Sequence, residues 1–149
     1  MYRLNRILFA ALFVGLAGIT TAGAQTADEV NKTLDELYGS HEPYHAFFEK
    51  LKKAVAENDK QTVASMVDYP FKARINDKAV TIRDAAHFAA DYDKVFTTKI
   101  KEAVAKQNYQ NLFANWQGVM IGDGEVWFSG ICNNDACEQQ TVRIIAVND

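Results

Sequence analysis

The sequence predicts an α+β fold in which N-terminal helices pack into a curved antiparallel sheet. Apolar residues recur with a helical period through most of residues 26–107, and alternate with a period of two between residues 111 and 147. A short hairpin at residues 71–82 is expected between the helices. Because an antiparallel sheet must bury one face, the apolar stripes of the helices are expected to cover it. We therefore expect a sheet wrapped around a long helix.

The first 24 residues are typical of a secretory signal peptide. Arg3 and Arg6 precede an apolar run from Ile7 to Ile19, and the segment ends in the small residues Ala22-Gly23-Ala24. The run is shorter than the roughly 20 residues that cross a bilayer. Cleavage after Ala24 removes 24 of 149 residues and leaves 125. We expect residues 25–149 to form a single domain, periplasmic or secreted, with no stable membrane insertion after cleavage.

Charge argues against two classes of partner. The whole chain has a net charge of −3, and the expected mature chain keeps 14 basic residues against 19 acidic ones, which gives −5. Nucleic acids and anionic membranes are bound by clustered lysine and arginine, whereas the basic residues here alternate with acids along helices. We expect no nucleic-acid partner.

The helices are expected in two groups around the hairpin. Gly39 ends the first helix, Asn58-Asp59 ends the second, and Asp84 caps a later one. The predicted helical segments are 26–38, 43–57, a short helix through Val63 and Val67, 85–96 and 98–107.

The last third is expected to form three strands joined by two tight loops. The strands are NLFANWQGVMI, EVWFSGIC and TVRIIAV, and Gly122-Asp123-Gly124 makes the first turn. Trp116 is expected to share a strand face with Leu112, Ala114 and Met120. The outer face is expected to carry Phe113 and either Val119 or Ile131. Apolar residues on this face would suit a homodimer formed through the sheet.

Cys132 and Cys137 are the only cysteines in the chain. An even count in an exported protein predicts a disulfide, and the turn-rich loop between them lies between two β-prone segments. The four intervening residues differ from the two of the usual redox motif, and a zinc site would need a second ligand pair.

His41-Glu42-Pro43-Tyr44-His45 spells H-E-x-x-H, the zinc-protease pattern. A working motif needs an intact helix, whereas Gly39-Ser40 ends one helix and starts the next, and Pro43 fits only a first helical turn. We interpret the motif as a surface helix start and expect no metal and no cofactor.

The order of elements resembles the nuclear transport factor two-like superfamily. The resemblance rests on ENDKQTVASMVDYPF, RDAAHFAADYDKVF and NLFANWQGVMIGDGEVWFSGI, and covers about residues 43–147. It implies a cystatin-like, cone-shaped roll around a pocket, often dimeric through the outer face of the sheet. The family includes dehydratases, isomerases, cyclases and transport adaptors, so the resemblance implies no single activity.

The candidate ligand-binding residues are Tyr92, Trp116, Trp127 and Arg143. Members of this superfamily that are enzymes place an Asp or His with a Tyr or Trp in the cone, and large aromatics also serve as core. Arg143 interrupts an apolar strand, where it either points outward or anchors an anion, and an outward position avoids the cost of an unpaired buried charge.

Two classes of function remain open. The first is a non-catalytic exported module that binds a small apolar ligand or a partner protein in the cone or on the sheet. The alternative is an isomerase or dehydratase using proton transfer by His87 or Asp91 with Tyr92 as donor. His87 and Asp91 are also spaced as an ordinary i,i+4 helix pair.

Overall fold

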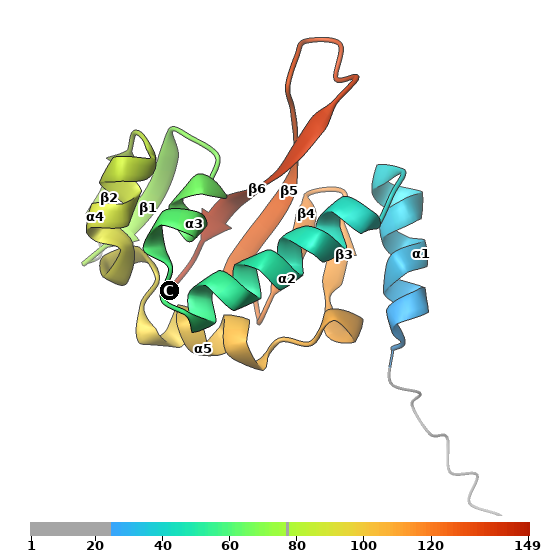
Figure 1. The fold of residues 1–149 in the computed structure, drawn as a ribbon, viewed down its shortest axis with the longest axis horizontal. Helices are drawn as coiled ribbons and strands as arrows, with labels where there is room; N and C mark the ends of the chain where they lie inside the picture. Colours follow the sequence, from blue (N-terminus) through green and yellow to red (C-terminus); the bar gives the residue numbers. More distant parts are fainter. Residues whose placement is uncertain (1–24, 77) are drawn as a thin grey trace, which may run out of the picture.

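The computed structural model describes residues 25–76 and 78–149. Helices and two antiparallel sheets make up this part, which confirms the α+β class (Figure 1). The predicted signal peptide, residues 1–24, lies outside the described residues. Every described helix is too short or too polar to cross a bilayer.

The helices begin and end at the residues that local chemistry favours. Thr26 and Glu29 form a capping box at the start of the first helix, and Asp59, Asp84 and Thr97 cap later ones. Gly39, at φ 86°, ends the first helix. The helices are α1 (Ala27–Tyr38), α2 (Glu42–Ala56), α3 (Lys60–Ser65), α4 (Ala85–Val95), α5 (Thr98–Lys106) and the 3₁₀ turn η1 (Tyr109–Asn111).

The strands form one small hairpin and one larger meander. The hairpin pairs β1 (Phe71–Ile75) with β2 (Lys78–Ile82), as the sequence predicts. The four-stranded sheet has the order β3-β4-β5-β6, from β3 (Phe113–Asn115), β4 (Gly118–Ile121), β5 (Val126–Cys132) and β6 (Gln140–Val147). Helix α2 crosses in front of this sheet in Figure 1.

The inner face of the sheet carries one buried row across its four strands. Ala114, Val119, Phe128 and Ile144 lie opposite one another in register, and the last three are 0% exposed. The Phe47 ring of α2 stacks on the Phe128 ring with centroids 5.0 Å apart. The centroid of the Tyr44 ring, also of α2, lies 6.4 Å from that of Phe128. Aromatic side chains of α2 therefore fill the space that the sheet curves around.

Two expectations about the third and fourth strands were wrong. NLFANWQGVMI forms two strands, because Asn115 accepts a hydrogen bond from the Gln117 amide and turns the chain. Trp116 lies in this turn, so it shares no strand face with Met120. Val119 faces the core and not the outer side, since its cross-strand neighbour is Ala114 and that of Phe113 is Met120.

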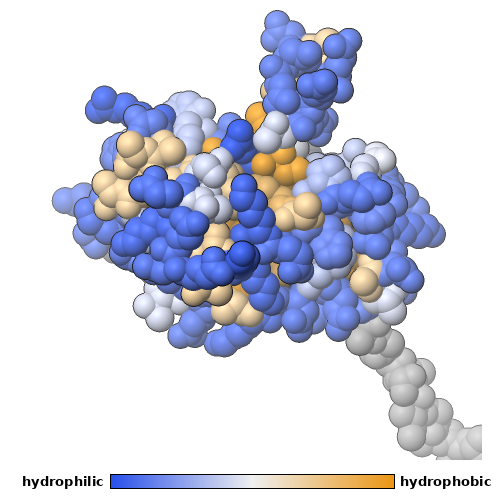
Figure 2. Space-filling view, viewed as in Figure 1, coloured by the Kyte–Doolittle hydropathy of each residue, from blue (hydrophilic) through white to orange (hydrophobic). Residues whose placement is uncertain are grey.

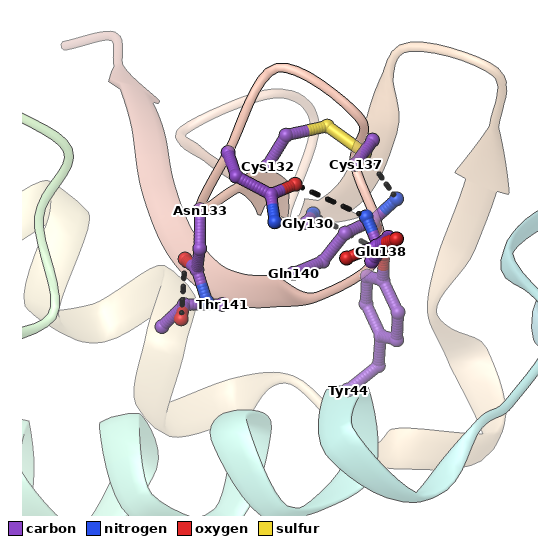
Figure 3. The surroundings of a disulfide bond; sticks show 9 residues. Tyr44, Gly130, Cys132, Asn133, Cys137, Glu138, Gln140 and Thr141 are labelled. Carbon is purple, nitrogen blue, oxygen red and sulfur yellow. Dashed lines mark hydrogen bonds between the residues drawn. A yellow bond between two sulfur atoms is a disulfide. The ribbon is translucent and has the colours of Figure 1, made fainter.

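The β5–β6 hairpin extends beyond the body of the domain and ends in the predicted disulfide (Figures 1 and 3). Cys132 and Cys137 are bonded, with Cα atoms 4.7 Å apart. The Asn133 amide donates to the Gln139 carbonyl, and the Thr141 hydroxyl donates to the Asn133 side chain. The disulfide braces a projecting tip and does not join the tip to the helices.

Removing the disulfide is expected to cost little and to act locally. On the chain-entropy model, closing so short a ring contributes about 2 kcal/mol. The double variant Cys132→Ser/Cys137→Ser should lower the free energy of unfolding in urea by about that amount or less, and speed amide exchange only near the tip. Faster exchange in α2 or β4 would contradict the assignment of a local brace.

Candidate functional site

The outer face of the four-stranded sheet carries a second cross-strand row, which is apolar and accessible. Phe113, Met120, Trp127 and Ala146 lie opposite one another in β3 to β6, and the Phe113 and Trp127 rings meet edge to face at 6.5 Å. Phe113 is 49% exposed, and the other three are half-buried. Neighbouring strands lie about 4.8 Å apart, so this outer apolar row is about 14 Å wide.

An irregularity in the sheet adds a further side chain to this face. The β5–β6 register shifts between Trp127 and Phe128, which leaves Ile145 without a directly paired residue. A side chain at Gly118 would lie 3.6 Å from the Ile145 Cδ1 atom and 2.8 Å from the Phe128 carbonyl oxygen. Glycine at position 118 therefore lets the backbones of β4 and β5 lie close together, and the Ile145 Cδ1 atom lies over this glycine at ordinary van der Waals distance. Ile145 extends the outer apolar row.

Trp116 and Arg143 border the same face. Trp116 is 82% exposed in the β3–β4 turn. Arg143 pairs with Ser129 and lies on the outward side of β6. Its guanidinium donates a hydrogen bond to the Ser65 carbonyl oxygen. Three of the four predicted ligand-binding residues, Trp116, Trp127 and Arg143, therefore lie on or beside the outer face.

Shallow hollows flank Trp127, and acidic groups line one of them. A hollow of about 350 Å³ lies between Trp127 and Gln117, Ile145, Ala146 and Asn148. The neighbouring hollow, of about 320 Å³, contains the carboxylates of Asp123, Glu125 and Asp149 against one ammonium group, that of Lys99. One positive and three negative charges give this border of the outer apolar row a local charge of −2.

Tyr92, the fourth predicted ligand-binding residue, lies in the core. It is 0% exposed, its ring stacks on Phe96 at 5.4 Å, and its hydroxyl has no hydrogen-bond partner among the described residues. The ammonium groups of Lys60 and Lys101 lie 5.7 and 4.8 Å from the ring centroid. Tyr92 thus sits among packed rings beneath two lysines.

Replacing Tyr92 by phenylalanine is expected to stabilise the protein. A buried hydroxyl without a partner costs desolvation free energy that phenylalanine does not, so Tyr92→Phe should raise the free energy of unfolding by about 1 kcal/mol. Tyr109→Phe is the matched control with the opposite sign, because the Tyr109 hydroxyl donates to Asn31 at 2.7 Å. Urea unfolding of both variants tests the two predictions. A lower free energy of unfolding in Tyr92→Phe would contradict the first, because it would mean that the Tyr92 hydroxyl makes a stabilising hydrogen bond.

Alkaline pH is expected to destabilise the protein through the half-buried Tyr38 and the buried Tyr92. Burial raises the pKa of Tyr38 and of Tyr92 to about 12. An unfolded tyrosine ionises near pH 10, so the folded protein loses these protons only at a higher pH. Stability should be intact below about pH 10 and fall as pH rises toward 12. Urea midpoints against pH measure this, and Tyr92→Phe should make the fall shallower.

His87 and Asp91 form an ion-pair chain on the surface of α4. The His87 Nε2 atom lies 3.3 Å from Asp91 Oδ2, and the Lys94 ammonium lies 2.7 Å from Asp91 Oδ1. The hydrogen bond from Lys94 is the main cause that lowers the pKa of Asp91, with His87 adding to it. Tyr92 lies in the core, whereas His87 and Asp91 lie on the surface. The three predicted catalytic side chains therefore do not converge on either hollow beside Trp127.

The H-E-x-x-H segment forms the entrance to α2, where Glu42 and Pro43 are exposed, the two histidines are half-buried and Tyr44 is buried. His41 is the N-cap residue, and its Nδ1 atom lies 2.8 Å from Asp35 Oδ1. The His45 ring stacks on Tyr109 with centroids 3.8 Å apart. Among the described residues, no group of three or more His, Cys, Asp or Glu side chains is placed to hold a metal ion.

No family model, curated protein or solved structure matches this chain. Membership of the nuclear transport factor two-like superfamily therefore stays a prediction. The residues that sequence reasoning missed are Met120, Ile145 and Ala146, which complete the outer apolar row. The sequence shows the alternation of apolar residues in β4 and β6, but it does not show the strand register that places Met120, Ile145 and Ala146 side by side.

Proposed function

We propose that the protein is an exported, non-catalytic binding module that holds a partner protein on the outer face of its sheet. The observation that carries the proposal is the outer apolar row of Phe113, Met120, Trp127 and Ala146, bordered by Trp116 at 82% exposure. Tryptophan and arginine are the residues most enriched at the energetic centres of protein interfaces. Both types occur here, at Trp116, Trp127 and Arg143.

The shape of this face favours a protein over a small molecule. Small ligands bind in concave sites that bury most of their surface. The hollows beside Trp127 are shallow, and the interior of the sheet is filled by side chains such as Phe47 and Phe128. A protein surface of the usual size, about 800 Å² per partner, can cover the row and its border together.

The charge of the border indicates the chemistry of the partner. Asp123, Glu125 and Asp149 outnumber Lys99 beside Trp127, so the complementary surface is apolar and bordered by lysine or arginine. A second copy of this chain would bring the same acidic border and, in the expected mature form, a charge of −5 of its own. The partner we propose is therefore a different protein.

Export agrees with the predicted signal peptide and with the disulfide. Disulfides form and persist in oxidising compartments and are rare in the cytosol. The hairpin tip with its Cys132–Cys137 bond suits a periplasmic or secreted protein.

Photo-cross-linking in the producing cells tests the proposal. A photoreactive phenylalanine analogue replaces Trp116 in one variant and Lys50, exposed on α2, in a matched control. We expect one discrete adduct from position 116, containing a second protein with a basic surface, and none from position 50. An adduct of twice the mass of the chain would identify a homodimer instead. No adduct at position 116, or equal adducts at both positions, would contradict the proposal.

A further inference from the structure

A groove lies between α2 and α5, away from the outer face of the sheet. It encloses about 410 Å³ and is lined by Thr98, Lys101, Glu102 and Ala105 from α5 and by Lys52, Val55 and Ala56 from α2. This volume is within the range of about 300–1,000 Å³ typical of small-ligand sites. Figure 2 shows hydrophobic residues between hydrophilic ones over these two helices.

The two helices run antiparallel, which places one lysine at each end of the groove. The Lys52 ammonium donates to the Gln107 carbonyl beyond the end of α5, while Lys101 reaches Asn58 beyond the end of α2. The lining residues of α5 span seven residue steps, so the groove is about 10 Å long. Val55, Ala56 and Ala105 supply its apolar surface.

Both lysines retain hydrogen-bonding capacity. An ammonium group has three N–H donors. Lys101 uses one on Asp93 Oδ1 at 2.8 Å and one on Asn58 Oδ1 at 3.4 Å, which leaves a third beside the Tyr92 ring, whose centroid lies 4.8 Å from the ammonium. The Lys52 ammonium lies 5.8 Å from the Phe48 ring centroid, so its alkyl stem runs along apolar surface.

The acidic residue of the lining is already paired. Glu102 Oε2 lies 3.1 Å from the Lys106 ammonium. The groove lining has two positive side chains and one negative one, and the outside partners of Lys101 and Glu102, which are Asp93 and Lys106, cancel each other, so the local charge is +1 on a chain that is acidic overall. This combination of apolar surface with cationic ends complements a molecule that has an apolar chain and an anionic head.

We propose that this groove binds a free fatty acid of medium chain length. The carboxylate pairs with the ammonium of Lys101, and the alkyl chain lies on Val55 and Ala105 beside the stem of Lys52. This site is separate from the outer apolar row, and the proposal does not depend on the proposed function.

Titration of the full domain with decanoate, followed by amide NMR, tests the proposal. We expect shifts at residues 52–56 and 98–105, and binding at least tenfold weaker for decyltrimethylammonium, which has a similar chain with a positive head. Loss of a charge-assisted hydrogen bond in Lys101→Gln should weaken decanoate binding about tenfold. Ala105→Glu, which adds a repelling carboxylate on an exposed helix position, should weaken it at least as much.

Lys53→Gln is the matched control, because Lys53 is exposed and pairs with Glu57 at 3.8 Å outside the groove. It should bind decanoate like the unmodified protein, and circular dichroism should show all variants folded. The proposal is overturned by an absence of shifts below the micelle concentration, by equal binding of the cationic analogue, or by unchanged binding in Ala105→Glu. Shifts at Trp116 and Trp127 instead would move the ligand to the outer face. If the same NMR signals of the groove shift when only the protein concentration is changed, without decanoate, the groove is an interface with a second copy of the chain and the proposal is overturned.

Discussion

Replacing Phe128 by alanine is expected to lower the free energy of unfolding by about 3–5 kcal/mol. Phe128 is 0% exposed, and its ring contacts Phe47 and Tyr44 of α2 in the centre of the inner row. Truncation leaves a cavity that neighbouring rings cannot fill without leaving their own contacts. Domains of this size are stable by only about 5–15 kcal/mol, so a large part of the stability should be lost. Urea unfolding measures the change.

Phe113→Ala is the matched control on the opposite face. The same residue type is 49% exposed there, and its main described ring contact is the edge-to-face pair with Trp127. It should lose about 1 kcal/mol or less. Similar losses in the two variants would contradict the assignment of one buried and one accessible face.

Replacing Trp127 by alanine is expected to abolish most of the binding to the partner identified by cross-linking. Trp127 lies in the middle of the outer apolar row, with neighbours in β4 and β6, which is where interface energy concentrates. We expect Kd to rise at least 30-fold, equivalent to about 2 kcal/mol. Isothermal titration calorimetry with the purified partner gives the change.

Two further variants separate this effect from general damage. Phe113→Ala should weaken binding less than Trp127→Ala, because Phe113 lies on the edge strand of the row. Lys50→Ala, exposed on α2, should leave Kd unchanged. An unaltered Kd in Trp127→Ala, with the domain folded, would place the partner elsewhere.

Local chemistry made the helices predictable. The boundaries of α1, α2, α4 and α5 fall within about two residues of those expected, because caps and glycine are read from neighbouring positions. The disulfide was predictable for a similar reason, since Cys132 and Cys137 are close in sequence and their loop is turn-rich.

Cross-strand geometry was not predictable from the same signals. The turn at Trp116-Gln117 depends on the Asn115 side chain, within a stretch that alternates like one continuous strand. Each residue of error in register exchanges the two faces of a strand, which is how Val119 was placed outside. The shift after Trp127 changes the pairing of β6 again.

The candidate site depends on that register, so the sequence identified its residue types better than its layout. Trp127 and Arg143 attract notice as a large and a charged residue within strands, and Trp116 as a large residue in a stretch that alternates like a strand. Tyr92 looked equivalent, but it belongs to a helix whose apolar stripe, with Phe88 and Phe96, packs into the core.

Fluorine NMR of protein labelled with 5-fluorotryptophan tests the central claim most directly. The chain contains two tryptophans, Trp116 and Trp127, and both report on the outer face of the sheet. Addition of the cross-linked partner in purified form should shift or broaden both fluorine signals, while decanoate leaves them unchanged. Formation of the complex with both signals unaltered would contradict the claim that the partner docks on this face.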